Sequence, residues 1–127
     1  MKTTCPSPNI RELLERWEES YKKGLLSFWL LLLLHERPAY AFEMRSKIED
    51  LSRGTISADD NSIYRALNRF ADIGVVSSEL QPSGQGPARR YYSLTDQGQE
   101  LLRCFTERNI LLFRDEEVEQ RIEEVMK

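Results

Sequence analysis

The stretch DDNSIYRALNRFADIGVVSSELQPSGQGPARRYYSL, from Asp59 to Leu94, decides the fold. It opens with a capped amphipathic helix that runs to Phe70 and is stopped at Gly74. Two short strands follow, joined by a turn rich in glycine and proline at residues 82–87. A helix followed directly by such a hairpin is typical of a winged helix, whose second helix enters the major groove of DNA. DNA binding is therefore the leading hypothesis.

The helix predicted over residues 60–70 has two different faces. Ile63, Leu67 and Phe70 fall on one side at about 100° per residue, so this side is expected to face the core. The opposite side carries side chains that can bond base edges and phosphates, namely Asn61, Arg65, Asn68 and Arg69. A solvated helix face would show the same pattern, and the hairpin behind the helix is what favours DNA contact.

Four further residues are candidate DNA contacts. Ser62 lies at the start of the helix, and Tyr64 lies at its flank, where it could reach a phosphate or serve as a half-buried structural tyrosine. Arg89 and Arg90 open the second strand and are candidates for phosphate or minor-groove contacts. Because side chains alternate along a strand, one of the two arginines could instead pair with an acidic residue of its own sheet.

Size and composition restrict the class of protein. With 127 residues the chain is about one domain. Its net charge of −3 argues against a strong sequence-independent polyanion binder, and the acidity gathers in residues 95–127, which hold nine acidic and five basic groups. Cys5 and Cys104 have neither C-x-x-C spacing nor the cysteine density of a secreted scaffold, so we expect a reduced, cytoplasmic setting.

Residues 25–34, LLSFWLLLLL, form a nearly continuous apolar run. Lysines precede it and small residues follow it, which is the order of a signal peptide and leaves an exported or membrane-anchored protein as an alternative. The run is shorter than the roughly twenty residues that cross a bilayer, and His35, Glu36 and Arg37 stand between it and the small residues of the supposed cleavage site. We expect a buried helix at the centre of a small core, and no membrane partner.

The other segments before the winged region also predict helix. Residues 1–8 are expected to be flexible. Asn9 can cap a helix with an apolar stripe, and Gly24 is expected to bend or break that helix before the leucine run. The next helix is expected to end near Gly54, and its apolar residues are Phe42, Met44, Ile48 and Leu51.

Thr95 can cap a long helical region that continues to the end of the chain. The terminal helices carry more apolar surface than a small domain can bury, which predicts dimerisation. The candidate dimerisation residues are Leu13, Leu14, Trp17, Phe105, Leu112, Val118, Ile122 and Val125. The expected organisation is a flexible N-terminus (1–8), a winged-helix DNA-binding domain that includes the N-terminal helix (9–94) and C-terminal dimerisation helices (95–127). The fold class is mainly α with a small β hairpin, that is, α+β.

Three blocks resemble the PadR-like transcriptional regulators, a family of small winged-helix repressors. Residues 38–44, PAYAFEM, are similar to the family's Pro-x-His-Gly-Tyr-Glu-Ile block. Residues 62–70 and 74–76 are similar to its Thr-Leu-Tyr-x-x-Leu-x-Arg-Leu and Gly-Leu-Ile. Residues 86–95, with Gly98, are similar to its Arg-Lys-x-Tyr-x-Leu-Thr-x-x-Gly. Together the blocks span about half of the chain in the expected order.

The chain departs from this pattern at Ala41, Phe42 and Asn61, and the last lies where it could shift the preferred DNA sequence. The resemblance implies a homodimer held by the terminal helices, with Tyr64 at the DNA surface. Some relatives bind flat hydrophobic ligands at the dimer interface, which implies a candidate effector site. Its candidate residues are Trp17, Trp29, Phe105 and Phe113, although aromatic residues at helical spacing are more often core.

No enzyme is indicated, because the sequence shows no activated nucleophile, carboxylate pair or glycine-rich phosphate loop. His35 has no second histidine or paired cysteine for a metal site, and no cofactor is expected. The sequence predicts a dimeric repressor that reads a palindromic promoter element of double-stranded DNA. The alternative is a winged-helix protein–protein interaction module that has lost DNA binding.

Overall fold

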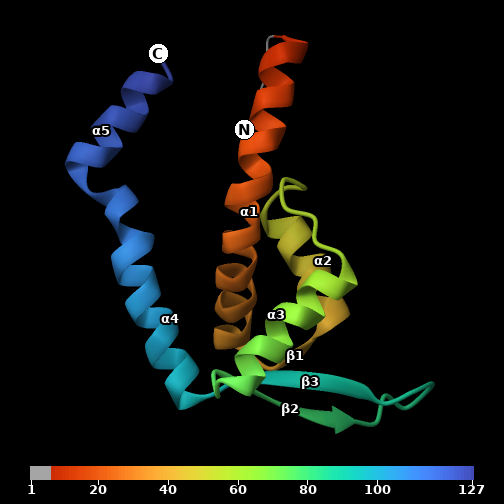
Figure 1. Ribbon diagram of the computed structural model, residues 1–127. Helices are drawn as coiled ribbons and strands as arrows, with labels where there is room; N and C mark the ends of the chain where they lie inside the picture. Colours follow the sequence, from red (N-terminus) through yellow and green to blue (C-terminus); the bar gives the residue numbers. More distant parts are fainter. Residues whose placement is uncertain (1–6) are drawn as a thin grey trace.

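The computed structural model describes residues 7–127, which contain five α-helices, one 3-10 helix and three strands. In chain order these are α1 (Pro8–Glu36), β1 (Ala39–Tyr40), α2 (Ala41–Leu51), α3 (Asp60–Asp72), β2 (Val76–Gln81), β3 (Arg89–Leu94), α4 (Asp96–Asn109), η1 (Leu111–Arg114) and α5 (Glu116–Val125). Figure 1 shows α1, α2 and α3 on one side of a small sheet, with α4 and α5 extending beside them. The expected α+β winged helix is confirmed.

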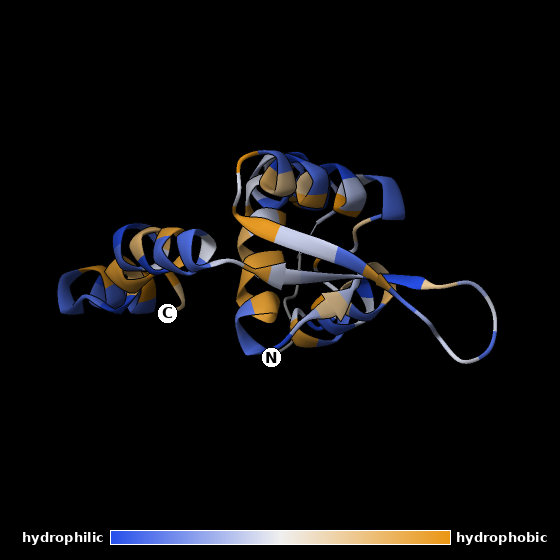
Figure 2. Cartoon of the chain, turned by 90° about the horizontal axis from the view of Figure 1, so that it is seen from below, coloured by the Kyte–Doolittle hydropathy of each residue, from blue (hydrophilic) through white to orange (hydrophobic). Residues whose placement is uncertain are grey.

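The sheet is antiparallel, with the strand order β1-β3-β2. β2 and β3 form the expected wing, in register from Val76 opposite Leu94 to Gln81 opposite Arg89. β1 pairs with the other edge of β3. This strand was not predicted, because two residues are too short to show a period. The wing extends from the body on the side away from α4 and α5 (Figures 1 and 2).

α1 begins earlier than predicted and is not broken. Its cap is Ser7, whose hydroxyl accepts a hydrogen bond from the backbone N–H of Ile10 at 3.2 Å, while Pro8 occupies the first turn. Asn9 therefore lies inside the helix, and the prediction that it caps α1 is wrong. The helix also continues through Gly24, because the leucines beyond it are held by the core and offset the cost of a helical glycine, about 1 kcal/mol. Residues 1–6 of the N-terminus predicted to be flexible lie outside the described residues.

The leucine run forms the centre of the core, as expected. Its buried side chains are Leu26, Leu30, Leu31, Leu33 and Leu34. They belong to one cluster with Met44 and Ile48 of α2, Ile63 and Leu67 of α3, and Tyr92 of β3. This part of α1 can be apolar around much of its circumference because other elements pack against it on several sides. Within residues 7–127, no helix combines the length and the apolarity that crossing a membrane requires.

α2 forms where it was predicted, but its apolar residues do not all face inward. Met44 and Ile48 are buried, whereas Phe42 is 59% exposed and Leu51 is also exposed. Phe42 precedes Met44 by two positions, which is about 200° around a helix, so the two side chains cannot share one face. Ala41 takes the inner position at the start of the helix.

The start of α4 is joined to the turn between α3 and β2. The Thr95 hydroxyl accepts a hydrogen bond from the Gly98 N–H at 3.0 Å, which confirms Thr95 as the cap, and donates to the Gly74 carbonyl at 2.7 Å. At the other end of α4, η1 separates it from α5. The C-terminal region is therefore two helices with a turn between them.

Candidate nucleic-acid interface

The orientation of α3 is determined at its start and along its inner face. The Asp59 carboxylate accepts a hydrogen bond from the Ser62 N–H at 2.7 Å, and this bond is the main reason why the pKa of Asp59 lies below its ordinary value of 3.8. Ile63, Ala66 and Leu67 are buried against the core. The helix therefore cannot rotate without exposing them, and its outer face is held in one direction.

The outer face of α3 carries the residues predicted to read DNA. Ser62 is half-buried. The other predicted residues of this helix are exposed, namely Asn61, Tyr64, Arg65, Asn68 and Arg69. Arg65 makes only a long hydrogen bond of 3.4 Å to the Ser62 hydroxyl, so its guanidinium keeps N–H groups for an external acceptor. Helical spacing places Asn61, Arg65 and Asn68 at the centre of this face.

Arg69 lies at the edge of that central group. It borders a cavity of about 260 Å³ between α1, α3 and α4, whose other walls include Phe28, Phe70 and Phe105. The cavity lies toward the terminal helices, so Arg69 is less well placed than Arg65 to reach a groove that α3 enters. Arg65 and Arg69 are one helical turn apart and lie on the same side of α3, and the difference between them is that Arg69 also borders this cavity.

The two wing arginines lie on opposite faces of the sheet. Arg90 donates a hydrogen bond from Nη1 to the Ser78 hydroxyl at 3.0 Å, on the face that continues into the core. Arg89 lies on the other face, with Cζ 4.7 Å from the centroid of the Tyr40 ring. Neither arginine forms an ion pair with an acidic residue within residues 7–127. Both charges are therefore available to an external anion.

Arg45 of α2 adds to this surface, although its role was not predicted. Its Nη1 donates to Asp60 Oδ1 at 2.9 Å, and its Cζ lies 5.3 Å from the centroid of the Phe42 ring. This ion pair connects α2 to the first residue of α3 and offsets a negative charge at the end of the helix that would approach phosphates. The two residues are 15 positions apart in sequence, so no local pattern indicates the pairing.

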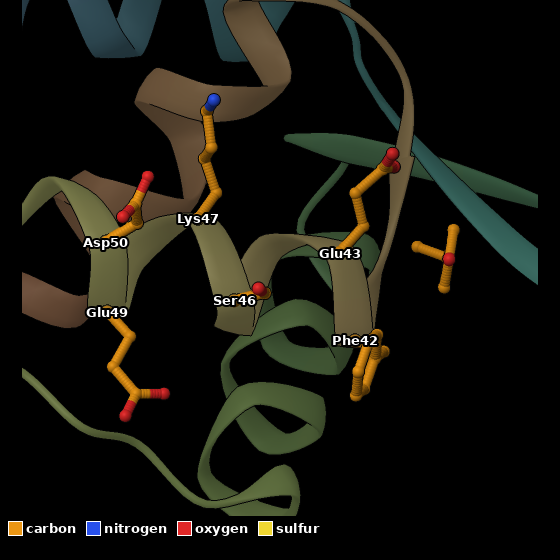
Figure 3. A pocket seen from close by; sticks show the side chains of 7 residues that line it. Phe42, Glu43, Ser46, Lys47, Glu49 and Asp50 are labelled. Carbon is orange, nitrogen blue, oxygen red and sulfur yellow. The ribbon is translucent and has the colours of Figure 1, made fainter.

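A second surface region does not resemble a catalytic or metal site. An open depression on α2 is lined by Tyr40, Phe42, Glu43, Ser46, Lys47, Glu49 and Asp50. Figure 3 shows that the side chains of Glu43, Lys47 and Glu49 point in different directions, so they do not converge on a common ligand. No group of three or more metal-ligating side chains occurs in the part of the chain described by the structure. His35 is engaged by Gln99, with Nδ1 2.8 Å from Oε1.

The residues predicted to mediate dimerisation are placed on α1, α4, η1 and α5. Trp17 is 76% exposed and Val125 is 80% exposed. Leu13, Phe105, Leu112 and Ile122 are also exposed, whereas Leu14 and Val118 are half-buried. Figure 1 shows the N-terminal half of α1 at a distance from α4 and α5. Trp17 and Val125 are therefore largely exposed in the described chain, whereas Phe105 stacks on Phe28 of α1.

An exposed polar helix face, held by a buried core and flanked by a β-wing, defines the winged-helix class of DNA-binding domains. Residues 30–104 match the model of the transcriptional regulator PadR-like family. The chain therefore belongs to this family of transcriptional regulators, as its three sequence blocks indicated.

Solved structures show the same fold. A PadR-family regulator from Eggerthella lenta is 24% identical, with a TM-score of 0.72 over 84% of this chain and 90% of that one. A PadR-like regulator from Bacillus cereus is 26% identical, with a TM-score of 0.62 over 83% and 94%. PadR of Bacillus subtilis in complex with operator DNA is 24% identical, with a TM-score of 0.61 over 67% and 48%. Among curated proteins no relative matches the chain.

Proposed function

We propose that this protein is a cytoplasmic homodimer that represses transcription by binding a palindromic promoter element through α3 and the wing. The observation that carries the proposal is the face of α3. Asn61, Arg65 and Asn68 are exposed on a helix whose opposite side is buried, so their direction is determined before DNA arrives. A similar fold, that of the Bacillus subtilis regulator, has been captured on operator DNA.

The chemistry of this face suits base reading. Arginine can donate two hydrogen bonds to the O6 and N7 atoms of guanine, and asparagine can pair with the N6 and N7 atoms of adenine. Arg90 on the wing would neutralise a phosphate, a type of contact that orients a protein on the duplex without reading its sequence. The proposed specificity therefore resides in α3, and the wing contributes affinity.

A dimer follows from the apolar residues of the terminal helices. Trp17 of α1 and Val125 of α5 would cost free energy if they stayed in water, and a second copy can cover them. A two-fold dimer presents two α3 helices, and half-sites one DNA turn apart have centres about 34 to 36 Å apart. Symmetric half-sites would then match the symmetry of the protein, and occupancy of a promoter would block transcription.

A hydrophobic effector is a narrower part of the proposal. Of the four candidate aromatic residues, Phe105 stacks on Phe28 with ring centroids 5.7 Å apart, and Trp29 packs against the core. Trp17 and Phe113 are exposed. A flat hydrophobic ligand would therefore meet Trp17 and Phe113, which both lie on the proposed dimer surface.

The experiment begins by enriching genomic fragments on the purified full chain at moderate salt. The affinity of the enriched operator duplex is then measured for Arg65→Ala. Because Arg65 lies at the centre of the α3 face, its loss should cost about 1 to 3 kcal/mol and flatten the preference at one base position per half-site. Arg108→Ala removes the same charge from an exposed position near the end of α4 and should leave both properties unchanged.

The outcomes separate the two candidate functions. Enrichment of inverted repeats, together with the selective effect of Arg65→Ala, supports a DNA-reading repressor. If the parent chain enriches no fragment, DNA binding is rejected and the protein–protein interaction module is favoured, with its acidic α5 as a candidate partner surface. If Arg65→Ala retains full affinity and preference, Arg65 is not a reading residue.

A further inference from the structure

Tyr92 has a buried ring and a hydroxyl without a protein partner. The residue is 3% exposed and belongs to the core cluster. Within residues 7–127, no hydrogen bond is made by its hydroxyl, and the oxygen is not among the fully enclosed atoms that lack a partner. The ring is therefore packed in the core, while the hydroxyl oxygen is accessible and free to donate a hydrogen bond to a group outside the described chain.

Two other polar side chains lie on the same face of the sheet as Tyr92. Arg90 precedes Tyr92 by two positions on β3, so both side chains lie on the same face of the sheet, and Ser78, which hydrogen-bonds Arg90, is the cross-strand partner of Tyr92. Burial raises the pKa of Tyr92; nearby Tyr64 on α3 raises it further, and Arg90 opposes the shift. The phenol therefore stays protonated and remains a hydrogen-bond donor.

We propose that Tyr64, Arg90 and Tyr92 form a phosphate notch, which holds one backbone phosphate of each DNA half-site where α3 meets the wing. This inference rests on the proposed function. The two phenols donate hydrogen bonds to the phosphate oxygens and the guanidinium supplies the positive charge. Ser78 takes one N–H of Arg90 and holds the side chain in place, which leaves the other N–H groups for the phosphate.

The opposite face of β3 provides a matched control. Tyr91 is adjacent to Tyr92 in sequence but lies on the outer face, where its ring is 5.4 Å from the ring of Tyr40 and Arg89 lies over Tyr40. Each face of the sheet therefore carries one arginine and one tyrosine from β3. Only the inner face adjoins α3, so Tyr91 should not contact the phosphate that the notch binds.

The first test compares Tyr92→Phe with Tyr91→Phe in the full chain, using the enriched operator duplex as the probe. Tyr92→Phe removes one hydroxyl per subunit and keeps the ring in the core, so it should weaken binding about tenfold for each half-site, as expected for a hydrogen bond to a charged group. The dependence of affinity on salt should stay unchanged because no charge is lost. Tyr91→Phe should bind within about twofold of the parent, and thermal unfolding of both variants should match it.

The second test locates the phosphate. Single phosphates of the operator are replaced by neutral methylphosphonates, one duplex at a time. At one position per half-site the parent should lose about tenfold in affinity, whereas Tyr92→Phe should lose less there because its bond is already absent and only the contacts of Arg90 and Tyr64 remain to be weakened. At the other positions both proteins should respond alike.

The outcomes distinguish the notch from the proposed function. Equal affinity of Tyr92→Phe and the parent, an equal loss in Tyr91→Phe, or identical methylphosphonate profiles would overturn the notch while leaving DNA binding in place. A parent chain that binds no duplex would overturn both.

Discussion

Gly98, in the first turn of α4, shows how one residue can be required for its small size. A β-carbon at this position would collide with the carbonyl oxygen of Val75 and would approach Leu94 Cδ1 to 2.7 Å. This close approach is where Thr95 joins α4 to the turn after α3. Gly24, in the middle of α1, differs in that a β-carbon there would meet nothing within 4 Å.

We expect alanine at these two glycines to change stability in opposite directions. Gly98→Ala should lower the free energy of unfolding by about 1 to 3 kcal/mol, because overpacking outweighs the better helix propensity of alanine. Gly24→Ala should raise it by about 0.5 to 1 kcal/mol, because only the propensity changes. Urea unfolding measures both effects. A higher free energy of unfolding in Gly98→Ala would show that the packing at Gly98 is not as close as the structure indicates.

In the wing, neighbouring residues of one strand have different surroundings because their side chains lie on opposite faces of the sheet. Arg89 and Arg90 are adjacent in sequence, yet the pleat of β3 points them to opposite faces. Arg90 adjoins Ser78 on the face near α3, whereas Arg89 stacks on Tyr40 at the far face. The strand thereby separates an arginine facing the proposed DNA surface from one that also packs on its own sheet.

The salt dependence of operator binding should distinguish the two arginines. Arg90→Ala should make the slope of log affinity against log salt concentration shallower by about one for each lost phosphate contact, that is, by about two for the dimer on its two half-sites. Arg89→Ala should change the slope by less than half as much, because its guanidinium is held over Tyr40. Equal changes would mean that both arginines reach phosphates. A slope unchanged in Arg90→Ala would mean that this residue serves the fold.

At the scale of the whole molecule, the terminal helices carry apolar side chains that stay exposed to solvent in a single chain. The wing extends away from the body on the side opposite to α4 and α5 (Figure 2), so the DNA-facing elements and the exposed apolar helices occupy different parts of the chain. A dimer through α1, α4 and α5 would therefore leave the wing free. This arrangement allows the association of two chains to be tested separately from the winged helix.

We expect Ile122→Lys combined with Val125→Lys to give a monomer, because two charges on the apolar face of α5 cannot be buried between subunits. The winged helix should still unfold cooperatively, and operator affinity should fall with the loss of the second half-site contact. Sedimentation at micromolar concentration measures the oligomeric state. Gln120→Lys combined with Glu123→Lys places two lysines on the polar face of the same helix and should leave a dimer.

A monomeric parent chain at this concentration would reject the dimer. So would a dimer with full operator affinity after substitution of Ile122 and Val125. Loss of the dimer in the polar-face control would show that added positive charge, and not its position, prevents association.

The sequence alone determined the order and kind of the main elements and most of the core. Periods of two and of about 3.6 residues are local properties, so the wing strands, α3 and the buried leucine run could be recognised before any packing was known. The cap of α3 at Asp59 could also be predicted, because Asp59 and the residue whose N–H donates a hydrogen bond to it, Ser62, are only three positions apart. Family membership followed from the same local blocks.

Only the tertiary structure decided which residues meet across the chain. It turned Phe42 outward under Arg45, paired Arg45 with Asp60, and gave β3 a second neighbour in the two-residue strand β1. It also continued α1 through Gly24, where the local cost of glycine is smaller than the gain from a buried leucine face. The physical reason is that these outcomes depend on the packing of segments distant in sequence, and a local pattern carries no information about which segment will be its neighbour.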